Sequence, residues 1–92
     1  MVVNSKKPYE ENRQGNRILR RFSTSINEQE LTWHRDARNR VVKVLKGTGW
    51  KFQLDDNIPV ELTEGDEFYI PAKVYHRVIM GHDDLEVEII ED

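Results

Sequence analysis

The sequence of 92 residues contains no cysteine and no long apolar run. The absence of cysteine excludes disulfide bonds and thiol chemistry, and it leaves the cellular compartment unassigned. No apolar stretch approaches the ~20 residues of a membrane-spanning helix, and the first residues lack the apolar segment of a signal peptide. We therefore expect no membrane partner, and we take a cytoplasmic location as the default.

A strong excess of one charge is also missing, because 17 acidic residues nearly balance 14 basic ones, for a net charge of -3. A general nucleic-acid-binding protein needs a basic surface, so nucleic acid is not an expected partner. The charges are nevertheless uneven, since residues 6–21 are basic and residues 86–92 are acidic. We expect these two ends to attract each other, within one chain or between two chains.

The length allows one domain with a modest core. Residues 1–16 are polar and show no periodicity, and they contain Pro8 and Gly15. We interpret them as an N-terminal arm that is flexible or docks on the rest of the protein. Residues 17–92 are then the single folded domain.

Apolar and polar residues alternate with period two through most of that domain, which is typical of strands. No segment shows ten residues of helical period, so little or no helix is expected. Short strands at close spacing, with turn residues between them, predict an all-β sandwich or barrel. The expected strands are residues 17–27, 30–36, 40–47, 49–56, 60–62, 67–71, 75–80 and 85–90.

Two histidines and one aspartate are the candidate metal ligands. His34 and Asp36 are two apart in an expected strand, so their side chains point to one face. His76 lies far downstream in another expected strand. Two histidines and one carboxylate have the composition of the 2-His-1-carboxylate set that suits Fe(II) with open positions. Mn is the next choice for such ligands, and Zn is possible.

Residues 31–80 resemble the cupin superfamily, specifically its small single-domain members. The second cupin motif reads G-x5-P-x-G-x2-H-x3-N, and the sequence follows it from Gly65 through Pro71 to His76. Lys73 replaces the second Gly, and Met80 replaces the Asn. This part of the resemblance is close.

The first cupin motif, G-x5-H-x-H-x3,4-E-x6-G, matches in spacing but not in chemistry. His34 stands at its first His, Asp36 at its second His, and Arg40 at its Glu, with Gly47 as its last Gly. The resemblance implies a small antiparallel jelly-roll β-barrel, whose pocket in most relatives holds a divalent metal. Cupins also often pair into homodimers.

Arg40 is the departure that matters most, because a guanidinium cannot bind a metal and would repel it. Period two places Arg40, Val42 and Val44 on one face, which looks inward in the family. Either His34, Asp36 and His76 hold a metal while Arg40 turns outward or binds an anionic substrate, or Asp36 and Arg40 form an internal ion pair. In the second case the pocket binds an organic anion without metal, with Arg40 as its anchor.

Three hypotheses for function follow. The first is a cupin that binds a small organic anion through Arg40, His34 and His76, with or without a divalent metal. The second is a metal-dependent dioxygenase or isomerase with His34, Asp36 and His76 as ligands of Fe or Mn. The third is a homodimeric structural or assembly module.

Overall fold

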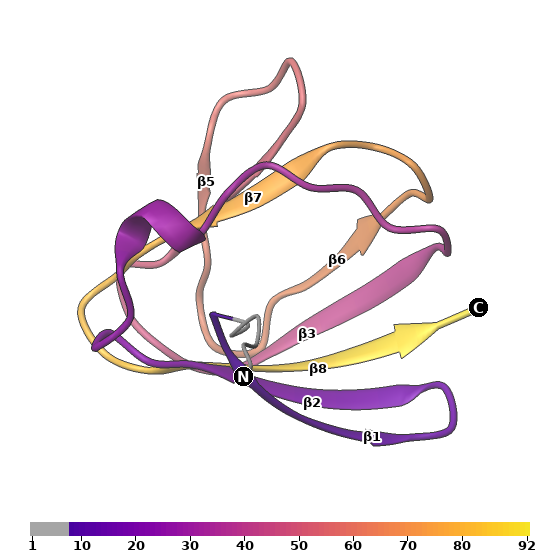
Figure 1. The fold of residues 1–92 in the computed structure, drawn as a ribbon, viewed down its shortest axis with the longest axis horizontal. Coiled ribbons are helices and arrows are strands. Elements are labelled where there is room, and N and C mark those ends of the chain that lie inside the picture. Colours follow the sequence, from indigo (N-terminus) through magenta and orange to yellow (C-terminus); the bar gives the residue numbers. More distant parts are fainter. Residues whose placement is uncertain (1–7) are drawn as a thin grey trace, which may run out of the picture.

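The computed structural model describes residues 8–92 and folds them into two antiparallel sheets (Figure 1). The larger sheet has the strand order β1-β2-β8-β3-β6, and the smaller one has the order β5-β4-β7. The all-β prediction is confirmed, since the helical structure in the described part is one 3-10 turn, η1 (Glu28–Glu30). The strands are β1 (Glu10–Gln14), β2 (Arg17–Phe22), β3 (Arg40–Lys46), β4 (Lys51–Leu54), β5 (Val60–Glu61), β6 (Glu67–Ile70), β7 (His76–Ile79) and β8 (Leu85–Glu91).

The core lies between the sheets and follows the predicted alternation. On β3, Val42 and Val44 are buried while the residues between and beside them are exposed. Strand β8 buries every second residue and occupies the middle of the larger sheet, between β2 and β3 (Figure 1). Trp50 is fully buried at the start of β4. No helix in residues 8–92 is long and apolar enough to cross a membrane.

Part of the predicted N-terminal arm is a strand of the same sheet. Strand β1 pairs with β2 from Glu10 opposite Arg21 to Gln14 opposite Arg17. All five of its residues are exposed, so β1 has no apolar face and no period-two signal. The turn of this hairpin contains Gly15, at a φ of 61°, and coincides with the predicted end of the arm. Residues 1–7 lie outside the described part.

The expected attraction between the basic and acidic ends occurs within one chain. A nitrogen of Arg13 lies 3.0 Å from Glu91, and Arg17 Nε lies 2.6 Å from Glu88. These pairs join β1 and β2 to β8. Because these charges are used internally, they no longer argue for a second chain, and the homodimer stays a prediction.

The prediction of a regular β-strand at residues 30–36 is wrong. This segment meets β7, the edge strand of the smaller sheet, and makes a single bridge there, between His34 and His76. The reason is physical: side chains alternate along any extended backbone, whether or not it is hydrogen bonded to a neighbour.

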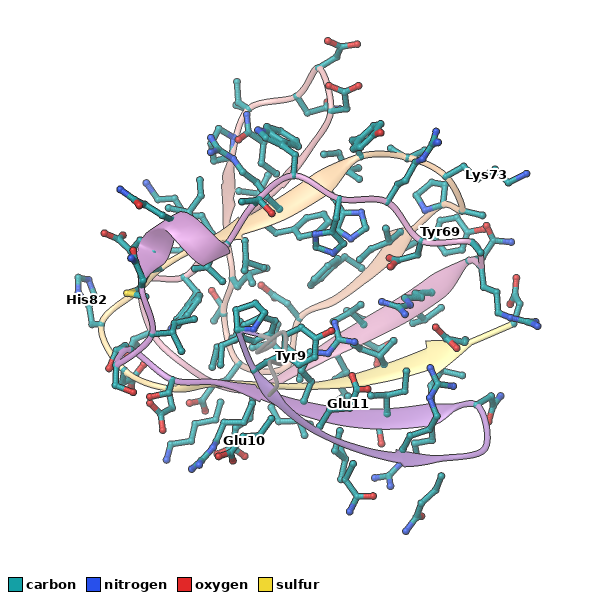
Figure 2. The ribbon with its side chains drawn as sticks, viewed as in Figure 1. Tyr9, Glu10, Glu11, Tyr69, Lys73 and His82 are labelled. Carbon is teal, nitrogen blue, oxygen red and sulfur yellow. The ribbon has the colours of Figure 1, made fainter. Side chains whose placement is uncertain are left out.

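One end of the barrel is closed by backbone packing, and we call residues 47–50 and 81–85 the closed end; His82 marks it in Figure 2. The indole Nε1 of Trp50 donates a hydrogen bond of 2.5 Å to the carbonyl of Asp83. A Cβ atom on Gly81 would lie 2.4 Å from both the carbonyl oxygen of Thr48 and the amide nitrogen of Trp50. Only glycine allows this approach.

Candidate metal centre

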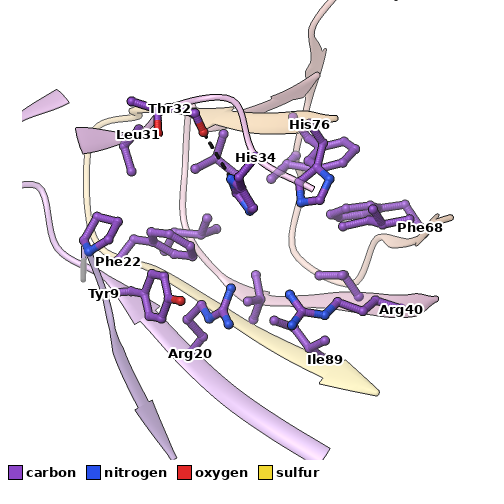
Figure 3. Close-up of a pocket in the computed structure, with 18 residues that line it drawn as sticks. Tyr9, Arg20, Phe22, Leu31, Thr32, His34, Arg40, Phe68, His76 and Ile89 are labelled. Atoms are coloured by element: carbon purple, nitrogen blue, oxygen red, sulfur yellow. Dashed lines mark hydrogen bonds between the residues drawn. The ribbon is translucent and has the colours of Figure 1, made fainter. Parts of the chain in front are cut away.

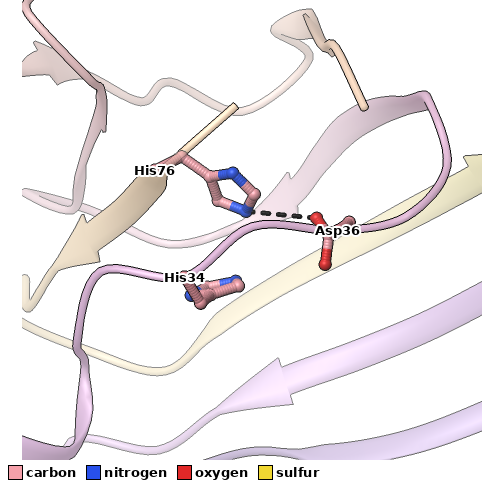
Figure 4. A group of neighbouring side chains, drawn as sticks. All are labelled: His34, Asp36 and His76. Carbon is pink, nitrogen blue, oxygen red and sulfur yellow. Dashed lines mark ion pairs between the residues drawn. The ribbon is translucent and has the colours of Figure 1, made fainter. Parts of the chain in front are cut away.

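His34 and His76 face each other as one antiparallel pair (Figure 4). The amide of His34 donates to the carbonyl of His76 at 3.0 Å, and the reverse bond is 2.8 Å long. The two rings meet edge to face with centroids 4.3 Å apart. His76 is buried in β7, whereas His34 lies in the irregular segment and is exposed. Backbone pairing therefore sets the spacing of the two imidazoles.

A backbone carbonyl holds each imidazole in one tautomer. Nδ1 of His34 lies 3.1 Å from the carbonyl oxygen of Thr32, and Nδ1 of His76 lies 3.0 Å from that of Val74. Because a carbonyl only accepts, each Nδ1 carries the proton and each neutral ring keeps its lone pair on Nε2. Metal-binding histidines in proteins are oriented by this kind of outer hydrogen bond.

Contacts on either side of the histidine pair hold the irregular segment to β7. The guanidinium of Arg77 lies 4.8 Å from the ring centre of Trp33, and that of Arg35 lies 5.2 Å from the ring centre of Tyr75. Both are cation–π contacts between neighbours of the two histidines. They stabilise the outer surface of the segment whose inner side carries His34.

Asp36 completes the group with an unsatisfied oxygen. Its Oδ2 is buried, lies 3.2 Å from Nε2 of His76 and has no hydrogen-bond partner among the described residues. If His76 is in the tautomer set by Val74, a carboxylate oxygen and an imidazole lone pair face each other, which is repulsive. A second proton on His76, or a cation between the two atoms, relieves that repulsion.

The pKa shifts of the His34 imidazole and the Asp36 carboxyl both favour the form that binds a cation. Although solvent reaches His34, desolvation by the protein groups around its ring is the largest effect on it and lowers the pKa of its imidazole, which favours the neutral form that can bind metal. Burial alone would raise the pKa of the Asp36 carboxyl, but Nε2 of His76, when it carries a proton, and the Arg40 guanidinium outweigh burial and hold that pKa below its ordinary value. Asp36 is therefore an anion at neutral pH.

The three residues fit a divalent metal. One ligand atom each from His34, Asp36 and His76 lies within 4.8 Å of the other two. Ligand bonds of about 2.0–2.2 Å place such atoms about 3–4 Å apart, so a small inward movement closes the site. Two imidazoles and one carboxylate leave positions open for water or another molecule.

Arg40 points inward and forms an internal ion pair with Asp36, which is the alternative in which we expect the pocket to bind an anion without metal. Arg40 contacts only Oδ1 of that carboxylate, however, so Oδ2, which faces His76, is still available to a cation. Nη1 of Arg40 lies 3.2 Å from Oδ1 of Asp36, while its Nε and Nη2 donate to Glu91 at 2.8 and 2.6 Å. All three nitrogens thus face carboxylates. The hydrogen bonds from Arg40 and Arg13 overcome the effect of burial and hold the pKa of Glu91 below its ordinary value.

A cavity of about 250 Å³ lies between the sheets, and two of the candidate ligands, His34 and His76, line it (Figure 3). His34, Arg40 and His76, the predicted ligand-binding residues, all line it. Most of the remaining wall is apolar, with Phe52 and Phe68 near the histidines. Of the four residues predicted to form one pocket, three line this cavity, while Asp36 is not part of its wall and contacts Arg40 and His76.

Two inward charges were missed. Glu91 is 8% exposed and continues the buried face of β8 one step beyond Ile89. Arg20 has a side chain that is 9% exposed and lies on the inward face of β2, between Ile18 and Phe22. Each residue is two positions from a buried neighbour, so the period-two pattern of β8 and of β2 is itself the signal that indicates an inward side chain.

Lys73 adopts the backbone conformation of the Gly that it replaces in the second motif. Its φ is 67°, in the left-handed region where glycine is usual. Its amide donates a 2.7 Å hydrogen bond to the carbonyl of Asp36. This turn, between β6 and β7, therefore helps to fix the backbone of the candidate metal ligand Asp36.

Comparison with solved structures gives the same fold over nearly the whole chain. A cupin family protein with a double-stranded β-helix from Methanocaldococcus jannaschii is 16% identical, with a TM-score of 0.73, over 99% of this chain and 85% of that one. A cupin-2 domain protein from Shewanella frigidimarina is 20% identical, with a TM-score of 0.62, over 97% of this chain and 83% of that one.

A third similar structure is that of Fe(II) HppE, which is 17% identical with a TM-score of 0.65. The match covers 83% of this chain but only 41% of that longer one. At these identities the likeness shows the fold alone. No curated protein matches the chain in sequence. The family model for the cupin domain matches residues 23–91, and the chain therefore belongs to the cupin family.

Proposed function

We propose that this cupin holds one divalent metal ion through His34, Asp36 and His76 and binds a small molecule next to it in the cavity. The observation that carries this proposal is the buried Oδ2 of Asp36, which faces Nε2 of His76 and has no hydrogen-bond partner in the described part of the chain. A cation bound there by both atoms would replace their repulsion by two attractive contacts.

The rest of the site has a defined part in this function. Thr32 and Val74 accept the Nδ1 protons and so aim both imidazoles at Asp36. Arg40 holds the other oxygen of Asp36, which orients the carboxylate and limits its movement. Apolar walls around the cavity keep water away from the ligand and strengthen polar contacts inside.

Fe(II) is the first candidate for the ion, because a 2-His-1-carboxylate set with open positions suits it. One protein of the same fold is known as Fe(II) HppE, which supports this choice. When bound, the metal would supply Lewis-acid or redox chemistry to a molecule in the cavity. We infer a metal-dependent enzyme of the dioxygenase or isomerase type, with Mn as the second candidate ion.

Titration of the apoprotein tests the metal site directly. Anaerobic Fe(II), and Co(II) as a spectroscopic probe, should bind with one equivalent per chain and raise the melting temperature. Asp36→Asn should weaken Co(II) binding by about 100-fold, since it removes the anionic ligand. His82→Gln is the matched control, because this third histidine is exposed and lies at the closed end.

Three results would count against the proposal. The first is less than about a tenth of an equivalent of bound metal in protein purified without a metal-affinity column, together with no thermal shift on adding Fe(II), Mn(II) or Zn(II). The second is equal weakening in Asp36→Asn and His82→Gln. The third is a stoichiometry that is unchanged when His76 is replaced by glutamine.

A further inference from the structure

Arg20 is a second arginine of the cavity, and neither the metal site nor Arg40 accounts for it. It lies on β2, while its guanidinium is on the cavity floor, across from the imidazole of His34 (Figure 3). The Arg20 side chain is 9% exposed and lines the cavity together with His34, so its charge is largely shielded from solvent. Arg20 and His34 therefore share one electrostatic environment.

The surroundings of Arg20 fix its guanidinium and leave one nitrogen available. Nε and Nη2 both donate to the same oxygen of Glu11, at 2.9 and 2.6 Å. The ring of Tyr9 lies beneath the guanidinium, 3.8 Å from its carbon. Nη1 makes no hydrogen bond to any residue from 8 to 92. A rigid guanidinium with an unused edge is a suitable anchor for an oxyanion.

Arg40 is less suitable for that role. Its three nitrogens face Asp36 and Glu91, so a ligand anion would have to displace or share these carboxylates. Arg20 faces one oxygen of one carboxylate only. The geometry thus moves the expected anion anchor from β3 to β2.

The net charge of the site would also favour an anionic ligand once a metal is bound. Three arginines, Arg13, Arg20 and Arg40, pair with three carboxylates, Glu11, Asp36 and Glu91, so these pairs are neutral together. With both histidines neutral, a divalent ion adds two positive charges to a mostly apolar cavity. Burying uncompensated charge is costly, so an anionic ligand is favoured over a neutral one.

We propose that Arg20 anchors the carboxylate of a small ligand with an apolar body, held between this guanidinium and the metal. The cavity of about 250 Å³ lies just below the range of about 300–1,000 Å³ that is typical of pockets for drug-sized ligands, which favours a small ligand. Its aromatic and aliphatic walls suit a hydrocarbon body. This inference rests on the proposed function and names the substrate class of the same site.

Benzoate and hexanoate, each compared with its neutral amide, are the probes. Calorimetry on the Co(II)-loaded protein should show the acids binding at least about tenfold more tightly than the amides, because a charge-assisted pair is lost with the amide. Arg20→Gln should weaken acid binding by about tenfold or more and leave amide binding unchanged. Arg21→Gln is the matched control, since this neighbour is exposed and pairs with Glu10 instead.

Two further variants separate loss of the anchor from loss of the fold. Arg20→Gln leaves Glu11 without its partner, so the double variant Arg20→Gln/Glu11→Gln restores a neutral pair and should show the same loss of acid binding. Arg20→Lys keeps the charge and should retain part of the binding. Co(II) affinity should change no more than about threefold in all three, because Arg20 is not a metal ligand.

The outcomes distinguish this inference from the metal site. Metal bound with one equivalent, but acids that bind Arg20→Gln as tightly as wild type or do not bind wild type at all, would overturn the anchor and leave the metal site standing. No metal bound, but acid binding to the apoprotein that depends on Arg20, would overturn the metal site and leave the anchor standing.

Discussion

The two ends of the barrel differ in backbone conformation and in how fully their buried polar groups are paired. At the closed end, glycine occurs where another chain segment comes near: Gly81 touches Thr48 and Trp50, and Gly47 packs on Leu85. At the end that carries Asp36, Arg40 and Glu91, which we call the site end, unfavourable features are retained. Lys73 has a left-handed backbone, and an oxygen of Asp36 lacks a hydrogen bond.

This difference separates the closely packed residues of the barrel from its strained and unsatisfied ones. Strained or unsatisfied groups persist when the surrounding structure holds them, and they gather at functional sites. The closed end, with its fully buried Trp50 and Leu85 of about 1% exposure, can provide that support. Three substitutions test the comparison in order of expected effect.

Gly81→Ala should have the largest effect, because its Cβ would overlap backbone atoms that cannot move independently. We expect the free energy of unfolding to fall by about 3 kcal/mol or more, a large part of what so small a domain has. Urea denaturation measures it. Gly15→Ala is the control: nothing lies within 4 Å of its added Cβ, so only the left-handed backbone opposes it, at about 1 kcal/mol. If Gly81→Ala and Gly15→Ala lowered the free energy of unfolding equally, close packing at the closed end would be disproved.

Glu91→Gln should have the next effect, because it leaves the buried Arg40 with weaker partners. We expect a loss of about 2–3 kcal/mol in the apoprotein at pH 7. Glu88→Gln is the control, since its ion pair with Arg17 lies on the outer face of the sheet and is more exposed, and it should cost less than about 1 kcal/mol.

The pH dependence of the same variant gives a second measurement. Glu91 has a pKa below its ordinary value of 4.5 in the fold. Its ionised form therefore stabilises the protein above about pH 4.5, and this contribution is lost as the pH falls through the lower folded value. Stability of Glu91→Gln should fall less steeply than that of wild type in this acidic range. If the stability of Glu91→Gln and of wild type fell equally with pH, Glu91 would not have the lowered pKa that its arginine partners give it.

Lys73→Gly should have the smallest effect and the opposite sign. Relief of the left-handed backbone is worth about 1–2 kcal/mol, and the added freedom of glycine in the unfolded chain offsets about 0.5–1 kcal/mol of it. We expect a gain of about 0.5 kcal/mol, seen as a melting temperature about 2–4 °C higher. Lys51→Gly in β4, where the backbone is ordinary strand, should instead destabilise. If Lys73→Gly lowered the melting temperature as much as Lys51→Gly, the backbone of Lys73 would not be strained.

The sequence predicted the parts of the fold that bury one face. Alternation identified β3, β4 and β8 and placed Arg40 on one face with Val42 and Val44, and the resemblance to cupins implied that this face looks inward. It could not reveal β1, whose residues are exposed on both faces and pair only through the backbone. It also gave a strand at residues 30–36, where an extended segment has a single bridge.

The candidate site was predicted in its residues but not in its charges. His34, Asp36 and His76 do lie together, and spacing within two family motifs was enough to select them. The partner of Arg40 could not be deduced, because Glu91 is 51 residues away and long-range pairing leaves no local pattern. Nor could the sequence decide between a free and a paired Arg40, which depends on that contact.

The pairing of His34 with His76 has a consequence for the unfolded chain. These residues are separated by 42 positions in the sequence, so one ion bound to both would close a long loop in the manner of a removable crosslink. Covalent closure of a loop of this size restricts the unfolded ensemble by roughly 3–4 kcal/mol. A reversible metal clip would supply up to that amount, which makes the amount of available metal a determinant of how much of the chain is folded.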